Sequence, residues 1–138
     1  MLKLIKKKTN HVSGQRKRAI ARVTAVPGTG KVIINKTSLE IYQPEISRLM
    51  IKEPLMLAGD SANKFDFKVN VKGGGITGQA GAVRQAIAKL LVINDKSLRK
   101  KFLDYDRSLL IADIRRTEPH KPSRSSAGPR RHKQRSKR

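Results

Sequence analysis

The sequence predicts an α+β domain, in which strands and helices follow one another, continued by a long basic tail. From Lys64 to Lys72 apolar and polar residues alternate strictly. This period of two residues is typical of a strand with one buried and one solvent-exposed face. Between Val83 and Leu91 apolar residues recur at helical spacing and form one stripe. Beyond Ile114 no apolar side chain other than proline is larger than alanine, so this segment cannot build a core.

Two further strands are expected before the alternating one. Residues 15–26 have a small apolar face of alanines and valine, and we expect them to form one strand. The turn residues 27–30 contain proline and glycine. Residues 31–35 should then form a short strand that makes a hairpin with the first.

The other elements are helices and one final strand. Pro44 is suited to the first turn of a helix, and Pro54 should end or kink that helix. Residues 95–103 should form a second, shorter helix after the long one. The apolar run Leu109, Leu110 and Ile111 is expected to form a last short strand.

The charge of the chain indicates a polyanionic partner. Its 138 residues include 32 Lys and Arg against 10 Asp and Glu, a formal net charge of +22. Such an excess repels itself unless a polyanion neutralises it, which makes nucleic acid the first candidate. A membrane surface is the weaker alternative, because no long basic amphipathic helix with large apolar anchors is visible. The N-terminal apolar run is too short for a signal peptide or a membrane span, and we expect a cytosolic protein.

A glycine-rich stretch connects the alternating strand to the long helix. Gly73, Gly74 and Gly75 allow positive φ and a close approach of the backbone to another surface. A glycine turn that opens a helix also presents free N–H groups and the positive end of the helix dipole, which suit a phosphate. The alternative is a tight turn whose glycines only relieve crowding, and the local pattern leaves both possibilities open.

Three arginines in the first expected strand are separated by even numbers of residues, at positions 16, 18 and 22. Arg16, Arg18 and Arg22 would then share one face, as a row of guanidinium groups spaced for a phosphate backbone. A charged row is more often a solvated strand face. The charge of the whole chain favours RNA contact instead.

The chain divides into a basic N-terminal arm or edge strand (1–14), a globular domain (15–113) and a basic tail (114–138). Extended at roughly 3.3 Å per residue, the tail could reach about 80 Å, far beyond a domain of this size. A tail that only improved solubility would not need so many charges of one sign. We therefore expect nucleic acid to order it.

Patterns typical of enzymes and metal sites are missing. The chain has no cysteine, and His11, His120 and His132 lack the spacing of metal ligands. Asp104 and Asp106 fit turn formation and arginine pairing better than acid–base catalysis. The glycine stretch lacks the Gly-Lys-Ser/Thr of a phosphate-binding loop and the spacing of a dinucleotide fingerprint. We expect no enzyme activity, no cofactor and no small-molecule substrate.

Four separate motifs resemble the small-subunit ribosomal protein S-nine family. The most specific runs from Gly73 to Ala88 and contains the glycine stretch. Residues 13–22 resemble the family's opening strand, and residues 105–110 with 113–119 resemble its junction with the tail. The terminal Ser136-Lys137-Arg138 resembles its C-terminus. The resemblance covers nearly the whole chain.

Residues 53–59 and 118–122 resemble the archaeal and eukaryotic branch, the archaeal form especially. Lys137 departs from that branch, which usually has tyrosine there, and is closer to the bacterial form.

The resemblance implies a mixed, mostly antiparallel sheet with helices packed on one face, similar to the second domain of ribosomal protein S-five. It also implies a place in the head of the small subunit, in contact with small-subunit rRNA and with neighbouring head proteins. The tail would reach the anticodon stem-loop of peptidyl-site tRNA, so the protein would act in the cytoplasm within the ribosome.

The basic residues and the resemblance together give two sets of expected contacts. The residues expected to bind rRNA are Arg16, Lys17, Arg18, Arg22, Lys72, Gly73, Gly74, Gly75, Gln79, Arg84, Arg107, Arg115, Arg116, Lys121, Arg124, Arg130 and Arg131. Those expected to bind tRNA are Arg135, Lys137 and Arg138.

The sequence is also compatible with two other functions. Some small-molecule kinases share the implied fold and bind ATP through a glycine-rich loop, but this chain lacks their second domain and a candidate base. A general DNA-compacting protein would also explain the charge. ATP, duplex DNA and folded rRNA are the ligands that distinguish the three functions.

Overall fold

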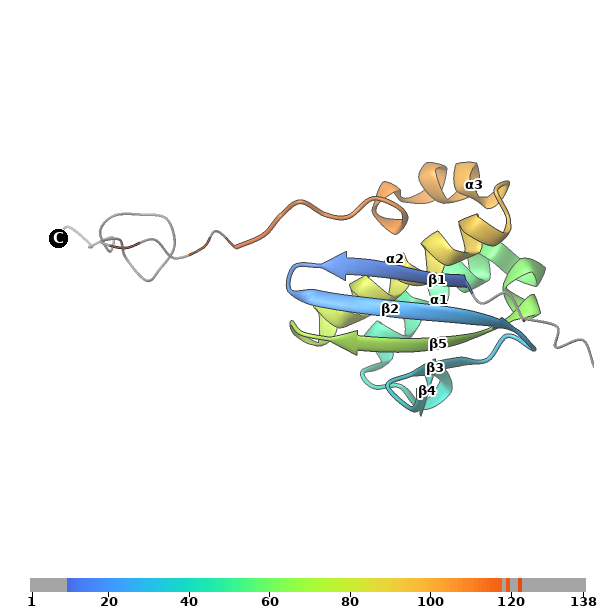
Figure 1. Ribbon diagram of the computed structural model, residues 1–138, viewed down its shortest axis with the longest axis horizontal. Coiled ribbons are helices and arrows are strands. Elements are labelled where there is room, and N and C mark those ends of the chain that lie inside the picture. The colour runs from blue at the N-terminus through green and yellow to red at the C-terminus, as the bar shows by residue number, and fades with distance from the viewer. Residues whose placement is uncertain (1–9, 118, 120–121, 123–138) are drawn as a thin grey trace, which may run out of the picture.

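The computed structural model describes residues 10–117, 119 and 122. In this part of the chain one mixed sheet has helices on one of its faces, which confirms the α+β prediction (Figure 1). The strands are β1 (Asn10–Arg16), β2 (Ala19–Pro27), β3 (Val32–Ile34), β4 (Thr37–Ser38) and β5 (Phe65–Lys72). The helices are α1 (Glu45–Ala58), α2 (Ile76–Asn94) and α3 (Leu98–Tyr105), with short 3₁₀ turns η1 (Leu39–Ile41), η2 (Gly59–Lys64) and η3 (Arg107–Leu109).

The strands lie in the order β1-β2-β5-β3-β4, and only the β3–β5 pair is parallel. A parallel pair needs a crossover, and the segment containing α1 provides it between β4 and β5. The predicted hairpin between residues 15–26 and 31–35 is therefore wrong. Strand β5 lies between β2 and β3, so the turn after β2 crosses the start of β5 to reach β3.

The core lies between the sheet and α2. Alternate side chains of β2 and β5 are buried, as the strict alternation of residues 64–72 predicted. Small alanines on α2 let the helix approach the sheet closely. Gly14 of β1 marks the closest approach, because a Cβ there would lie 2.4 Å from the carbonyl oxygen of Ala82. Gln85 is the buried polar residue at this contact, and its side chain accepts a 2.8 Å hydrogen bond from the backbone N–H of Gln15.

Helix α1 continues through Pro54 to Ala58, so of the predicted end or kink at Pro54 the structure excludes the end. A proline inside a helix lacks the N–H that would bond to the preceding turn, which costs about 3 kcal/mol. Pro54 is fully buried together with Ile51, and this burial offsets part of the cost. The helix instead ends at Gly59, whose φ of 57° only glycine adopts readily.

The last predicted strand, at Leu109, Leu110 and Ile111, is absent from the described residues. Leu109 is buried, but it belongs to the 3₁₀ turn η3. The side chain of Asp106 starts that turn by accepting a 2.8 Å hydrogen bond from the backbone N–H of Ser108. This capping closes the chain into a turn where apolar content alone indicated a strand.

Two glycines of the glycine stretch have the positive φ that the sequence was expected to allow. Gly73 has φ 78° and Gly74 has φ 68°. Both lie against the hairpin between β1 and β2, where a Cβ on Gly73 would come within 2.5 Å of the Arg18 carbonyl oxygen. Gly75 precedes α2 in extended conformation, and a Cβ there would meet nothing within 4 Å.

We expect Gly73→Ala to lower the free energy of unfolding by about 1 kcal/mol or more, because alanine strains a positive φ and its Cβ meets backbone. Gly75→Ala is the matched control. It should cost less than Gly73→Ala, because its φ is negative and its Cβ meets nothing within 4 Å, which leaves only the weaker preference for alanine at a helix N-cap. Urea unfolding of both variants, followed by circular dichroism, measures the difference. Equal midpoints for the two variants would contradict this account of the turn.

Candidate nucleic-acid interface

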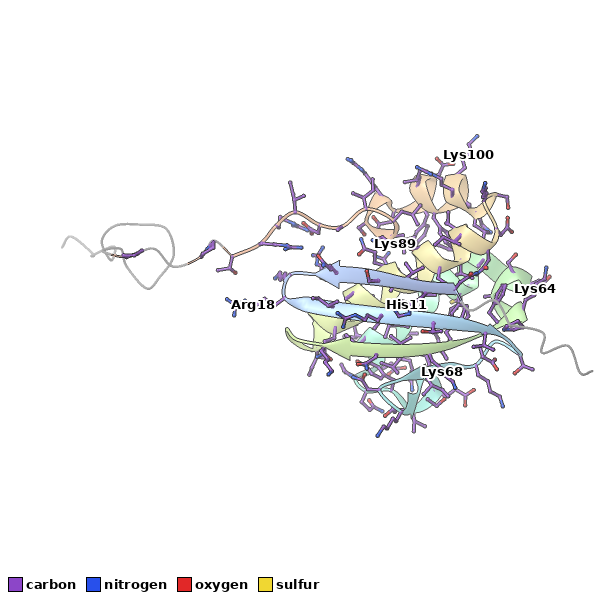
Figure 2. All side chains as sticks on the ribbon, in the orientation of Figure 1. His11, Arg18, Lys64, Lys68, Lys89 and Lys100 are labelled. Carbon is purple, nitrogen blue, oxygen red and sulfur yellow. The ribbon has the colours of Figure 1, made fainter. Side chains whose placement is uncertain are left out.

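No helix among the described residues covers one face of the sheet (Figure 1). The exposed positions of β2 and β5 on this face carry basic side chains. The register places Arg22 of β2 opposite Asn70 of β5, and Thr24 opposite Lys68. His11 of β1 lies opposite Thr24 and contacts its hydroxyl at 3.0 Å. Figure 2 shows His11 and Lys68 on this open side of the sheet. The face therefore offers both charge and hydrogen-bonding groups to a ligand.

Lys72 extends the same face toward the glycine stretch. It lies opposite Ile20 at the end of β5 and is exposed. We name Arg22, Lys68 and Lys72 the sheet-face cations. They follow one another along two adjacent strands, on the side opposite to the buried residues.

Asp66 is the acidic residue of β5 on this face, and its carboxylate is hydrogen-bonded to the turn before β3. Its carboxylate accepts hydrogen bonds from the backbone N–H groups of Lys31 (3.0 Å) and Thr29 (2.8 Å). These two bonds, that from Lys31 first, lower the pKa of Asp66 below its usual value. The carboxylate thus orders the turn before β3, at the opposite end of β5 from Lys72.

The second part of the interface is the end of the domain where the β1–β2 hairpin and the glycine stretch meet. Lys17 and Arg18 form the hairpin turn and are exposed, and Figure 2 shows Arg18 at this tip. A groove of about 680 Å³ lies beside them, lined by the hairpin, by residues 74–78 and by Arg116 and Thr117. Helix α2 begins here without a side-chain cap, so its first N–H groups face this end. Gln79 donates a 3.2 Å hydrogen bond to the Gly73 carbonyl and braces the turn.

The predicted row of Arg16, Arg18 and Arg22 on one strand face is wrong. A hairpin separates them, because Lys17 adopts a positive φ of 53° and the chain reverses there. Arg16 then lies on the helix side of β1, where it forms an ion pair with Asp113. Arg22 lies on the open face, and Arg18 lies in the turn between them.

Arg84 has two acidic partners inside the domain. Its guanidinium pairs with Glu53 at 2.5 Å and with Asp106 at 2.9 Å, and its side chain is only 15% exposed. Burial alone would raise the pKa of Asp106, but hydrogen bonds from Ser108 and Arg84 outweigh it and lower that pKa. Arg84 thus joins α1, α2 and the turn before η3. These pairs give Arg84 a structural role, and its expected phosphate contact stays a prediction.

The chain leaves the domain at the same end as the hairpin (Figure 1). Asp113 binds both Arg16 of β1 and Arg115, whose Nη2 lies 2.7 Å from its carboxylate. Arg116 donates a 2.7 Å hydrogen bond to the side-chain oxygen of Gln15. The hydrogen bonds from Arg115, first that of its side chain, hold the pKa of Asp113 well below its usual range. We call this set of contacts the exit latch.

Removing the Asp113 carboxylate tests the exit latch. Its carboxylate accepts a 2.9 Å hydrogen bond from the Arg115 backbone N–H, so Asp113→Ala should speed hydrogen exchange of that amide at least tenfold. Asp104→Ala is the matched control, because Asp104 is exposed and makes no side-chain hydrogen bond to other described residues. Because the pKa of Asp113 is lowered on folding, the wild-type latch should stay closed at neutral pH and open only in acid. Exchange that is equally fast in wild type and Asp113→Ala would contradict the latch.

The remaining predicted residues are either exposed or outside the described part. Arg107 is exposed at the start of η3. The residues outside the described part are Lys121, Arg124, Arg130, Arg131, Arg135, Lys137 and Arg138.

Sequence reasoning missed several members of the interface. Lys68 and Asn70 could have been found, because the alternation of residues 64–72 already placed them on the wet face. His11 and Thr24 could not, since their proximity depends on the β1–β2 register. Among the described residues no cluster of acidic and histidine side chains could hold a metal ion. None of the helices in this part of the chain is long and apolar enough to cross a membrane.

Comparison with known proteins finds a matching family model and close relatives. The family model described as ribosomal protein S9/S16 matches residues 14–138. The small ribosomal subunit protein uS9 of Methanococcus maripaludis strain C7 is 48% identical over 131 residues, which cover 94% of this chain and 98% of that protein. The protein of the same name from Methanococcus vannielii is 47% identical over the same shares of the two chains. Both relatives come from archaea, in agreement with the branch that residues 53–59 and 118–122 indicated.

Proposed function

Because this chain belongs to the ribosomal protein S9/S16 family, we propose that it binds small-subunit rRNA through its sheet face and hairpin end and contacts peptidyl-site tRNA through its tail. As a family member it is a structural protein of the small ribosomal subunit and not an enzyme. It therefore works in the cytoplasm, within the ribosome, with rRNA and ribosomal proteins as partners.

The observation that carries the rRNA proposal is the distribution of charge over the domain. The sheet-face cations project from a surface that no helix covers, and no described residue is paired with them in a salt bridge. Other cations, by contrast, are neutralised inside the domain: Arg16 by Asp113 and Arg84 by Glu53 and Asp106. Unpaired, solvated cations are the ones that can exchange their counterions for phosphate groups.

The hairpin end adds backbone donors to this charge. The glycine turn exposes its main chain beside Lys17 and Arg18, and the uncapped first turn of α2 adds its N–H groups. Backbone donors and flexible cations recognise phosphates without reading bases. The domain is thus suited to a folded RNA backbone, and the low aromatic content of 4% does not favour stacking on unpaired bases.

The tail proposal is supported by the composition of residues 114–138 and by the direction of the exit. The exit latch fixes where the tail leaves the domain, beside the hairpin end. Arg138 can grip a backbone phosphate with two parallel hydrogen bonds, and Lys137 adds charge without demanding geometry. Such contacts serve every tRNA alike, because they do not depend on base sequence.

A competition experiment tests the proposed function against the two alternatives. The protein is mixed with labelled small-subunit rRNA, and unlabelled rRNA, duplex DNA of equal phosphate concentration, or ATP is added. We expect only rRNA to compete fully at near-stoichiometric amounts. Equal competition by duplex DNA would indicate a general compacting protein, and displacement by millimolar ATP alone would indicate a nucleotide site.

A further inference from the structure

Helix α1 has a second apolar face that points away from the domain. Ile46, Leu49 and Met56 are 76%, 54% and 77% exposed. Their spacing places them on one side of the helix, opposite the buried Ile51 and Pro54. Three large side chains exposed together on one helix face form a contact surface that the domain itself leaves uncovered.

The charge around this face differs from the charge of the rest of the chain. Residues 39–58 contain three glutamates and two basic residues, whereas the whole chain has 32 basic against 10 acidic residues. Arg48, one of the two, donates a 2.8 Å hydrogen bond to the Glu40 carbonyl and lies 3.4 Å from the Glu45 carboxylate. Glu40 is exposed and has no salt-bridge partner among the described residues, so its carboxylate repels phosphates, and Glu45 balances the charge of Arg48. An apolar surface whose rim carries no excess of cations is therefore unsuited to RNA.

From this combination we infer that the outward face of α1 binds another protein of the small subunit. The partner offers an apolar patch to Ile46, Leu49 and Met56, and lysine or arginine side chains opposite Glu40 and Glu45. Apolar contacts with a charged rim are the usual anatomy of a protein–protein interface. The inference rests on the proposed function, in which rRNA occupies the opposite, open side of the sheet.

Introduced cysteines can test this face, because the chain contains none of its own. Met56→Cys places a thiol on the α1 face, and Lys68→Cys places one on the open sheet face as a matched control. The rate of maleimide alkylation is measured for the free protein, for its complex with protein-free small-subunit rRNA, and for complete reconstituted small subunits. Ile46→Cys repeats the measurement about three helical turns earlier on the same face of α1. Circular dichroism checks that each variant is folded.

The expected pattern separates the two surfaces. The Met56→Cys thiol should react equally fast in the free protein and in the rRNA complex, and at least tenfold more slowly in complete subunits. A thiol-to-amine cross-linker on this variant should give a protein adduct in complete subunits. The Lys68→Cys thiol should be protected already by rRNA alone.

Three results would overturn the inference. Protection of the Met56→Cys thiol by rRNA alone would make α1 an RNA contact, and full reactivity in complete subunits would leave the face without a partner. Protection that grows with concentration of the free protein would assign the face to a second copy of this chain. If instead the Lys68→Cys thiol stays reactive in the rRNA complex, the proposed sheet-face contact fails while the α1 result can still be read.

Discussion

Changing Arg22, Lys68 and Lys72 together to glutamine is expected to weaken binding to small-subunit rRNA by on the order of a hundredfold at about 0.1 M salt. Each phosphate contact contributes roughly 0.7–0.9 to the slope of log affinity against log salt, so the slope should fall by about 2 to 3. The fold should persist, because all three side chains are exposed and point away from the core. Filter binding over a salt series measures both the affinity and the slope.

The matched control removes the same charge from the helix layer. Lys96, Arg99 and Lys100 are exposed in or just before α3, and Figure 2 shows Lys100 far from the open face of the sheet. Glutamine at these three positions should change the slope by less than about one. If both triple variants lose the same affinity, net charge alone explains binding and the sheet face has no special part.

Removing Ser136, Lys137 and Arg138 is expected to speed dissociation of peptidyl-site tRNA by about tenfold, while subunit assembly stays nearly normal. The three removed residues carry no apolar side chain, so the domain should keep its stability. The lost contacts are two cations on phosphates, so the salt slope of tRNA binding should fall by roughly 1 to 2. Filter retention of labelled tRNA on reconstituted subunits gives the rate.

A full-length variant distinguishes charge from length. Lys137→Gln combined with Arg138→Gln keeps the tail intact and removes both cations. We expect it to release tRNA nearly as fast as the truncated protein. Dissociation at the wild-type rate from both variants, at every salt concentration, would exclude the tail end from tRNA binding.

The elements predicted correctly from the sequence are those whose signal is local. The alternation of residues 64–72 gave β5, and the apolar stripe between Val83 and Leu91 gave α2. The glycine stretch was expected to allow positive φ, and two of its three glycines have it. In each case the pattern within one segment decides the structure, because the segment is long or its residues permit few conformations.

The errors come from contacts between distant segments. The β1–β2 hairpin turns at Lys17, a residue without the usual preference for positive φ, so the sequence of residues 15–26 gave no sign of it. The pairing of β3 with β5 depends on the crossover through α1. The acidic partners of Arg84, Glu53 and Asp106, could not be predicted either, because nothing in its sequence neighbourhood reveals them. A basic residue that the fold pairs with carboxylates has less charge to offer to a phosphate.

The central claim is that rRNA covers the open face of the sheet and leaves the helix layer free. Acetylation of lysines, read by mass spectrometry in the free and rRNA-bound protein, tests every lysine in one experiment. We expect Lys17, Lys68 and Lys72 to lose most of their reactivity on binding, while Lys96 and Lys100 keep theirs. Protection of Lys96 and Lys100, with Lys68 and Lys72 still reactive, would contradict the claim.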